Sequence, residues 1–238
     1  MKAIILAAGR GSRMKHATDN IPKCLLKVKG KTLLEIQIEA LKKAGIKEIG
    51  IVTGYLSEQL RDYCENTFYN DKWDETNMVV SLMSAQNWLR QSDCVVSYSD
   101  IYYDDSIVKK LIKDNCQIGV AYDPNWQKLW RERFENPLSD AETFQLSSNN
   151  NIIEIGNKTS QINEIQGQYM GLMKFTIKGW SNLEKIITAL KKDELKKIQI
   201  TQLLQKCISS GFEIKAIPNN SEWGEVDSQK DLDLYNLK

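Results

Sequence analysis

A short segment near the start of the chain combines glycines with positive charges in a way that suits a polyphosphate. The segment Gly9-Arg10-Gly11-Ser12-Arg13 directly follows an apolar run at residues 3–8, and Lys23 lies a little further on. Glycines at the end of a buried strand let the backbone turn tightly and approach an anion closely. Arg10, Arg13 and Lys23 would supply positive charge there. This segment therefore predicts a binding site for the phosphates of a nucleotide.

Two better-known phosphate-binding motifs are excluded by what the segment lacks. The dinucleotide-binding pattern Gly-x-Gly-x-x-Gly requires a third glycine at position 14, where this chain has Met14. A Walker loop requires Gly-Lys-Ser or Gly-Lys-Thr after four spacer residues, and the segment has neither. Gly9 and Gly11 alone would also fit an ordinary glycine turn. The fixed spacing from these glycines to Pro22 and Lys23 favours a phosphate site over an ordinary turn.

The pattern Leu-Ala-Ala-Gly-x-Gly-Ser-Arg-Met at residues 6–14, followed by Pro22-Lys23, resembles the signature of the nucleoside-triphosphate-dependent nucleotidyltransferases. This family includes the sugar-phosphate nucleotidylyltransferases and smaller cytidylyltransferases that act on phosphocholine, 2-aminoethylphosphonate or phosphoglutamine. The chain departs from the signature at His16, where the family usually has proline, and at Ala17, where it has a larger apolar residue. The resemblance therefore defines both ends of this loop and leaves its path around His16 open.

The resemblance implies a nucleotide site that begins at the glycine loop and continues at the ends of neighbouring strands. Within the family, the segment that corresponds to Asn77 and Ser81 helps to select the base, and a helix cap is the alternative role for Asn77. The implied nucleotide-binding residues are Leu6, Ala7, Ala8, Gly9, Arg10, Gly11, Ser12, Arg13, Lys23, Gly54, Tyr55, Asn77, Ser81 and Ser99.

Two aspartates are the candidate metal ligands. Asp100 follows an apolar strand pattern at residues 94–96, and Asp227 lies in the segment Trp223-Gly-Glu-Val-Asp-Ser. The resemblance pairs them as Mg²⁺ ligands, and Mg²⁺ prefers oxygen ligands from one or two carboxylates together with phosphate oxygens and water. For Asp227 the alternative role is a cap for a helix at residues 229–236.

Lys23 is the candidate for stabilising charge during the reaction. Attack on the α-phosphorus of a nucleotide builds negative charge on its non-bridging oxygens and on the departing pyrophosphate. A positioned cation and Mg²⁺ stabilise this charge, so no covalent enzyme intermediate is needed. Pro22 restricts the backbone just before the lysine. The implied catalytic residues are Arg13, Lys23, Asp100 and Asp227.

Aromatic and charged residues gather in the second half of the chain, where an acceptor would bind. Aromatic faces beside carboxylates suit a cationic amine or a quaternary ammonium group. Trp126 and Trp130 could instead pack on one face of a helix, because they are four positions apart. Within the family a second lysine meets the acceptor phosphate, and Lys158 is placed for that role. The acceptor-binding residues that we expect are Asp123, Trp126, Trp130, Lys158, Glu164, Tyr169, Trp223 and Glu225.

Composition excludes several classes of protein. The chain has 238 residues with 42% hydrophobic content, which predicts one domain, residues 1–238, with a large core. Its net charge of +1 argues against a nucleic-acid partner. No apolar run reaches the roughly 20 residues of a membrane span, and no cleavable signal peptide fits the first residues. Five scattered cysteines are typical of reduced thiols in a cytoplasmic protein. The sequence leaves a homo-oligomer open.

Strand and helix patterns alternate over the first half of the chain. Strands are predicted at 2–6, 48–52 and 94–96, with helices at 32–44, 57–68 and 78–90, which indicates an α/β fold with a doubly wound, mostly parallel, Rossmann-like sheet. Further strands are predicted at 118–122, 144–146, 152–155, 170–175 and 212–217, and helices at 178–192 and 199–210. Residues 123–170 are expected to form a small mixed-strand lid that binds the acceptor.

These observations favour an Mg²⁺-dependent cytidylyltransferase. It would join CTP to phosphocholine, 2-aminoethylphosphonate, phosphoglutamine or a similar amino compound, release pyrophosphate, and serve the modification of surface or capsule polysaccharide. A sugar-1-phosphate nucleotidylyltransferase that uses UTP or dTTP is the alternative within the same class. A nucleotide-binding regulatory module without catalysis is the alternative from another class, and the joint presence of Arg13, Lys23, Asp100 and Asp227 argues against it.

Overall fold

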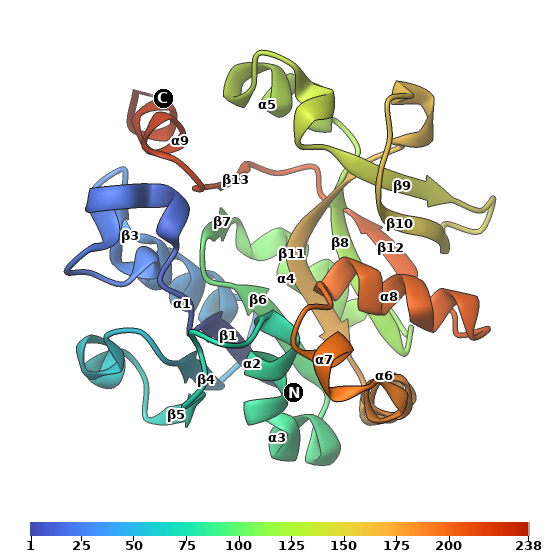
Figure 1. Cartoon of the computed structure of the whole chain (residues 1–238), viewed down its shortest axis with the longest axis horizontal. Coiled ribbons are helices and arrows are strands. Elements are labelled where there is room, and N and C mark those ends of the chain that lie inside the picture. Colours follow the sequence, from blue (N-terminus) through green and yellow to red (C-terminus); the bar gives the residue numbers. More distant parts are fainter. Residues whose placement is uncertain (238) are drawn as a thin grey trace.

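The computed structural model describes residues 1–237 of the chain. Within that range, seven strands form one sheet in the order β12-β8-β11-β6-β1-β4-β5 (Figure 1). Strands β1, β4, β5 and β6 run parallel, as do β8 and β12, whereas β11 is antiparallel to β6 and β8. The strands are β1 Lys2–Ala7, β4 Glu48–Thr53, β5 Asn66–Tyr69, β6 Cys94–Tyr98, β8 Ile118–Asp123, β11 Gln168–Phe175 and β12 Lys215–Pro218. The predicted α/β class with a mostly parallel sheet is confirmed.

Helices bury both faces of this sheet. In β1, Ile4 and Leu6 face a cluster that includes helices α2, α3, α6 and α8, whereas Ala3 and Ile5 face a cluster that includes α1 and α4. Because successive side chains of a strand point to opposite faces, a strand buried on both sides must be apolar at every position. The helices are α1 Leu33–Lys43, α2 Met78–Ser84, α3 Gln86–Gln91, α4 Asp105–Lys113, α6 Ile177–Ala189, α7 Lys192–Leu195 and α8 Ile200–Ser209.

The start of α1 is stabilised by a capping box. The hydroxyl of Thr32 accepts a hydrogen bond from the backbone N–H of Glu35, and the Glu35 carboxylate accepts one from the backbone N–H of Thr32. These two bonds satisfy backbone donors that lack partners within the helix. Gly45 follows the helix with a φ of +93°, a conformation that glycine adopts without strain.

The predicted helix at residues 57–68 is wrong. Only Ser57–Tyr63 is helical, as a 3₁₀ segment, and the chain then continues into β5 at the edge of the sheet. The sequence Asn-Thr-Phe-Tyr in β5 alternates between half-buried and exposed side chains, which is the pattern of a strand with one covered face. An edge strand with one exposed face contains few apolar residues, and for this reason the sequence did not predict β5.

Two other boundaries differ from the sequence prediction. The single helix predicted at 78–90 is interrupted at Ala85, so that α2 and α3 are separate. The strand predicted at 212–217 begins only at Lys215, as β12. The chain turns at Gly211, which has a φ of +84°, and residues 212–214 form no strand. A further short strand, β13 Trp223–Glu225, pairs antiparallel with β7 Ile101–Tyr103 and was not predicted. This pairing brings the segment around Asp227 to Asp100.

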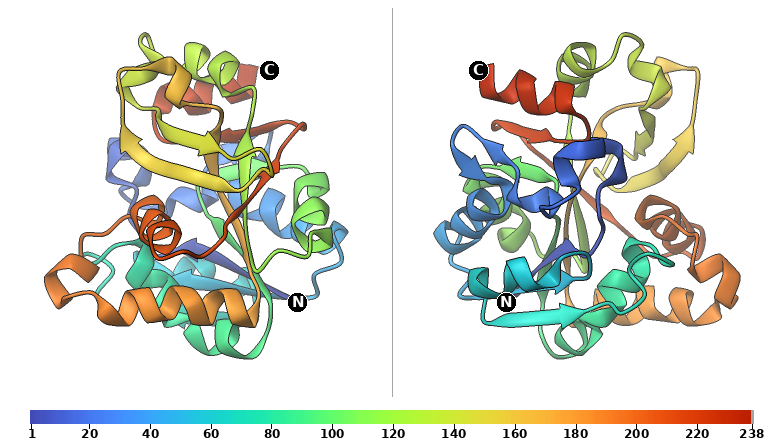
Figure 2. Two further views of the ribbon diagram at one scale, coloured as in Figure 1. Left: turned by 90° about the vertical axis from the view of Figure 1, so that its right-hand side faces the viewer. Right: turned by 60° about the vertical axis from the view of Figure 1, so that its left-hand side comes forward.

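Residues 123–170, which we expect to form the lid, include a helix and a two-stranded hairpin, and their buried side chains join the same apolar clusters as the main sheet. The strands predicted at 144–146 and 152–155 are present as β9 Glu142–Leu146 and β10 Ile152–Lys158, which pair as an antiparallel hairpin, and α5 Trp126–Arg133 precedes them. Figures 1 and 2 show α5 and the hairpin at the same end of the molecule as the C-terminal helix α9 Gln229–Leu237. The strands β2 Lys27–Val28 and β3 Lys31–Thr32 form another small hairpin.

Across residues 1–237 there is no helix with the length and apolar character needed to cross a bilayer.

Candidate active site

The glycine loop leaves the carboxyl end of β1, where the sheet is buried on both faces. Gly11 has a φ of +71°, and a β-carbon at this position would lie 2.8 Å from Cδ of Lys23. Only glycine can therefore turn the chain here while the lysine side chain packs against the loop. The Thr18 hydroxyl donates to the Gly11 carbonyl oxygen at 3.2 Å and holds the following turn against the loop.

The end of β4 lies directly beside this loop. The backbone N–H of Tyr55 donates to the carbonyl oxygen of Ala8 at 2.9 Å, and its hydroxyl donates to the carbonyl oxygen of Thr18 at 2.9 Å. A β-carbon at Gly54 would lie 2.7 Å from the Ala8 carbonyl oxygen, so this close approach also requires glycine. The structure thus brings together the predicted residues at the ends of β1 and β4.

Lys23 lies between the two predicted metal ligands. Its ammonium nitrogen is 2.8 Å from Oδ2 of Asp100 and 2.7 Å from Oδ1 of Asp227, although these residues lie 77 and 204 positions away in the sequence. Burial acts to lower the pKa of Lys23, but the two carboxylates outweigh it and raise that pKa above its ordinary value. The lysine is therefore a fixed, buried positive charge at the carboxyl ends of the strands.

Asp227 is held ionised by several cations. Burial acts to raise the pKa of its carboxyl group, but Lys23, Arg13 and Arg133 lower it below the usual value. Arg13 Nη2 lies 2.8 Å from Asp227 Oδ1. The cap of helix α9 is provided by Ser228, whose hydroxyl accepts from the backbone N–H of Asp231, so Asp227 is not the cap residue.

A third carboxylate joins the two aspartates. Glu225, which we expected at the acceptor, lies with Asp100 and Asp227 in one cluster, and one oxygen from each lies within 4.8 Å of the others. We call these three residues the carboxylate cluster. Burial, and then the neighbouring Asp227, raise the pKa of Glu225 to about 8, whereas Arg133 acts to lower it.

The carboxylate cluster fits a divalent metal ion. Its donors are all carboxylate oxygens, which hard cations such as Mg²⁺ prefer. Asp100 Oδ1 is buried and makes no hydrogen bond to any group of residues 1–237, so this oxygen is available as a ligand. The sequence had paired Asp100 with Asp227 and had missed Glu225 as the third member.

Two further residues of the site were not identified from the sequence. The side chain of Arg133 is fully buried, and it lies against both Glu225 and Asp231. In the sequence, Arg133 and Asp231 belong only to short-range patterns of their own helices. Arg133 follows Trp130 by three positions, which places both on one face of α5, and Asp231 follows Ser228 in a capping pattern. Neither signal pointed to the carboxylates.

The tryptophans of the lid are core residues. Trp126 and Trp130 are 1% and 3% exposed, and their rings meet edge to face with their centroids 6.0 Å apart. Their indole N–H groups donate to the Ile165 carbonyl oxygen and to Asp140. This corrects the expectation that the two rings offer a face to an acceptor, because both the faces and the polar edges are used within the lid.

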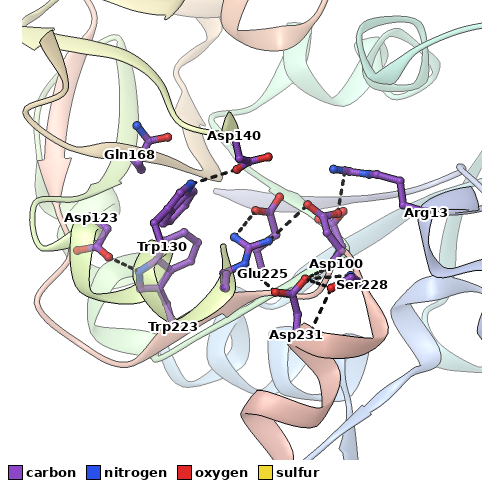
Figure 3. Close-up of polar contacts among 12 residues, drawn as sticks. Arg13, Asp100, Asp123, Trp130, Asp140, Gln168, Trp223, Glu225, Ser228 and Asp231 are labelled. Atoms are coloured by element: carbon purple, nitrogen blue, oxygen red, sulfur yellow. Dashed lines mark hydrogen bonds and ion pairs between the residues drawn. The ribbon is translucent and has the colours of Figure 1, made fainter. Parts of the chain in front are cut away.

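Asp123 and Trp223 also bind each other. Trp223 Nε1 donates to Asp123 Oδ2 at 2.9 Å, and the other oxygen of Asp123 accepts from the backbone N–H of Asn125 (Figure 3). Both residues are buried. The structure therefore assigns them to the framework that joins β8, α5 and β13, whereas the sequence had suggested contact with an acceptor.

The other predicted acceptor residues lie on the lid and near the cluster. Lys158 is exposed, and its ammonium group donates to the backbone oxygen of Asp140 at 3.1 Å. Glu164 is half-buried and accepts a hydrogen bond from the Thr159 hydroxyl. Their roles toward an acceptor stay predictions.

Tyr169 faces the strand that leads to Asp100. Its ring meets the ring of Tyr98 edge to face with the centroids 5.6 Å apart, and burial raises its pKa well above the ordinary value. The pairing of β11 with β8 is irregular between Tyr169 and Met173, and Gly171 has a φ of +75° there. A β-carbon at Gly171 would lie 2.8 Å from the Tyr98 ring, so this bulge allows the two tyrosines to pack together.

The residues predicted to select the base have different environments. Asn77 caps α2 through its side-chain oxygen, and its amide group donates to the carbonyl oxygens of Leu195 and Ile198. Its capping role is therefore the one that the structure shows. Ser81 is buried, and its hydroxyl oxygen accepts from the amide of Asn70 at 3.1 Å. Ser99 lies in the turn just before Asp100.

Comparison with known proteins places this geometry in a family. A family model described as a MobA-like NTP transferase domain matches residues 3–139. The chain is 38% identical to CTP:phosphoglutamine cytidylyltransferase of Campylobacter jejuni, over 98% of each chain. It is 45% identical to choline-phosphate cytidylyltransferase of Streptococcus pneumoniae over 39% of this chain and 42% of that protein.

Solved structures share the fold. The CTP:phosphocholine cytidylyltransferase of Streptococcus pneumoniae aligns with a TM-score of 0.72 at 23% identity, and the alignment covers 100% of this chain and 99% of that one. The inositol-1-phosphate CTP transferase of T. maritima aligns with a TM-score of 0.74 at 22% identity, and the alignment covers 99% and 94% of the two chains. The family model and the full-length similarity to a cytidylyltransferase confirm the resemblance to nucleotidyltransferases, and the chain belongs to the MobA-like NTP transferase family.

Proposed function

We propose that the protein is a cytidylyltransferase that transfers the cytidylyl group of CTP to a small phosphorylated or phosphonylated amino compound. The observation that carries this proposal is the carboxylate cluster, which surrounds the buried ammonium group of Lys23 beside the glycine loop. Full-length similarity to a CTP:phosphoglutamine cytidylyltransferase supports CTP as the donor and an amino compound of the phosphoglutamine type as the acceptor.

The reaction needs one substitution at phosphorus. An oxygen of the acceptor phosphate attacks the α-phosphorus of CTP and forms a new P–O–P bond, while the bond from the α-phosphorus to the oxygen of the β-phosphate breaks and pyrophosphate leaves. The acceptor phosphate is already ionised at neutral pH, so no general base is required. The single histidine, His16, is almost fully exposed and pairs with Asp19, which is consistent with a role outside the chemical step.

The cations of the site stabilise the charge that develops. Lys23 is held by two carboxylates, and Arg13 reaches Asp227 with a largely exposed side chain that can also meet phosphate. Backbone N–H groups of the glycine loop can bind the phosphates at close range. Mg²⁺, held by Asp100, Glu225 and Asp227, would supply further positive charge to the phosphate oxygens.

We place the acceptor between the carboxylate cluster and the lid. Lys158, Glu164 and Tyr169 are the residues of this region that we assign to it, because they carry a positive charge, a carboxylate and an aromatic hydroxyl at the lid. An acceptor with both a phosphate group and a nitrogen-bearing end would match these three groups. The product would carry its acceptor group on CMP through a phosphoanhydride bond, and such an activated group suits the modification of surface polysaccharide.

Release of pyrophosphate with a panel of substrates tests the proposal. The purified protein is incubated with Mg²⁺ and CTP, UTP, dTTP or ATP, together with phosphoglutamine, phosphocholine, 2-aminoethylphosphonate or glucose-1-phosphate. We expect turnover with CTP and one of the amino acceptors, and none by the Asp100→Asn variant. Efficient use of glucose-1-phosphate with UTP or dTTP alone would favour the sugar nucleotidylyltransferase. Tight binding of CTP without pyrophosphate release from any pair would favour a regulatory module.

A further inference from the structure

One buried guanidinium group links the lid to the carboxylate cluster. Arg133 is the last residue of α5, and its side chain has no exposed surface. Its Nη1 lies 3.0 Å from Glu225 Oε2, and its Nη2 lies 3.6 Å from Asp227 Oδ2. Two of the three proposed metal ligands are therefore in contact with a residue of the lid.

Asp231 completes this link from the side of helix α9. Its Oδ1 accepts a hydrogen bond from Arg133 Nε at 2.9 Å. Its Oδ2 accepts from the backbone N–H groups of Asp227 and Ser228, at 3.0 and 2.9 Å, and from the Ser228 hydroxyl. One carboxylate thus orients the arginine and also fixes the backbone at the metal ligand Asp227.

The lid holds the guanidinium group from the opposite side. Its central carbon lies 5.1 Å from the centre of the Trp130 ring and 5.0 Å from the centre of the Phe134 ring. Trp130 is itself fixed by its hydrogen bond to Asp140 (Figure 3). Arg131, two positions earlier on α5, is exposed and donates a hydrogen bond to the side chain of Gln127, so the burial is specific to Arg133.

We propose that Arg133 and Asp231 are positioning residues. They fix the side chains of the carboxylate cluster in a defined position relative to the lid. The inference rests on the proposed function, because it concerns the ligands and the acceptor region assigned there. A planar guanidinium group can meet carboxylates in several directions, whereas a lysine ammonium group is a single point of charge. The arrangement therefore requires the shape of arginine as well as its charge, and metal binding and acceptor binding both depend on it.

Arg133→Lys tests this requirement, because it keeps the charge and removes the planar shape. Loss of groups that orient metal ligands typically lowers metal affinity or activity by about 10- to 100-fold. We expect a decrease of that size in Mn²⁺ affinity in the presence of CTP, together with a lower kcat and a higher acceptor KM. The affinity for CTP in EDTA should stay unchanged, because the glycine loop makes no contact with Arg133. Arg131→Lys is the matched control and should resemble the wild type in all four measurements.

Asp231→Asn provides a second test that does not remove the arginine. The amide keeps the shape of the carboxylate, but one of its two ends must face the donors as an N–H group. We expect a similar decrease in Mn²⁺ affinity. The double variant Arg133→Lys/Asp231→Asn should lose no more than about the larger of the two single effects, because both residues act through one network. Additive losses of Mn²⁺ affinity would show that the two residues contribute independently, and they would overturn the proposal.

The result that overturns the proposal is distinct from failure of the proposed function. If both single variants fold and keep wild-type Mn²⁺ affinity and acceptor KM, Arg133 and Asp231 have no positioning role. If Arg133→Lys does not fold, Asp231→Asn decides the question by the same measurements. Asp100→Asn removes a proposed metal ligand directly, so wild-type Mn²⁺ affinity in that variant would show that the metal site itself is wrong.

Discussion

The glycine loop at residues 9–13 and the lid at residues 123–170 both adjoin the carboxylate cluster, but they use their chemical groups differently. The loop keeps its cations outside, since the side chains of Arg10 and Arg13 are 48% and 66% exposed. The lid buries Trp126 and Trp130, and Arg133 at the end of α5 has no exposed side-chain surface. The loop can therefore meet a ligand with little rearrangement, whereas the buried Arg133 of the lid is already paired with Glu225 and Asp231.

This difference shows which kinds of chemistry can be recognised in a sequence. A phosphate loop works through its backbone and through residues that are adjacent in the chain, so the motif and the site are the same segment. The lid works through pairs such as Trp223 with Asp123, which lie 100 positions apart. The sequence shows that the lid is rich in aromatic residues, but it does not show in which direction their side chains face.

The largest effect that we expect concerns the lid as a structural unit. Trp126→Ala should lower the free energy of unfolding by about 3–5 kcal/mol, because it removes a fully buried indole from the core. Denaturant unfolding measures this loss. Tyr69→Ala is the control, since that side chain is 60% exposed on the edge strand β5, and a surface change of this kind should stay within about 0.5 kcal/mol. If Trp126→Ala had wild-type stability and a raised acceptor KM, Trp126 would be an acceptor-binding residue and not a core residue.

The next effect concerns the cluster that the two regions share. Asp227→Asn should lower turnover by about a hundredfold or more, which is typical for the loss of one preorganised charged group in an active site. Steady-state kinetics with CTP and the acceptor found by the panel measure the loss. Asp233→Asn, on the exposed face of helix α9 that follows Asp227, is the matched control and should keep wild-type turnover. Near-normal rates for Asp227→Asn would remove this residue from the proposed mechanism.

A smaller effect is expected at the glycine loop. Gly11→Val places a β-branched side chain at a φ of +71° and against Lys23, where backbone strain alone costs about 1–3 kcal/mol. CTP affinity, measured by titration calorimetry, should fall by roughly tenfold to a hundredfold. A β-carbon at Gly9 would meet nothing within 4 Å, so Gly9→Ala should fold as well as the wild type. Unchanged CTP affinity in Gly11→Val would mean that the loop does not approach the nucleotide.

The smallest effect distinguishes the lid-side tyrosine from the buried tryptophans. Tyr169→Phe removes one hydroxyl group and keeps the ring that packs on Tyr98. A lost hydrogen bond to substrate is worth about 0.5–1.5 kcal/mol, so the acceptor KM should rise by about twofold to tenfold. CTP affinity and the unfolding midpoint should change little. Equal changes in the KM for CTP and for the acceptor would place Tyr169 outside the acceptor region.

Much of the fold and part of the site were predictable because local patterns carried them. The continuous apolar pattern of β1 marked a strand buried on both faces, and the capping box at Thr32 and Glu35 marked the start of α1. Strand β5 was missed because an edge strand with one covered face has few apolar residues. Its alternating pattern over four residues was too short to outweigh the helical pattern before it.

The sequence by itself determined the glycine loop, the family, and the chemical identity of Lys23, Asp100 and Asp227. These features depend on residue types at fixed short spacings, which the chain carries in any conformation. Only the tertiary structure decided that Glu225 joins the two aspartates, and that Arg133 and Asp231 stand behind them. The pairing of β13 with β7 and the packing of α5 near α9 bring these distant side chains together, and burial then makes each charge depend on its partners.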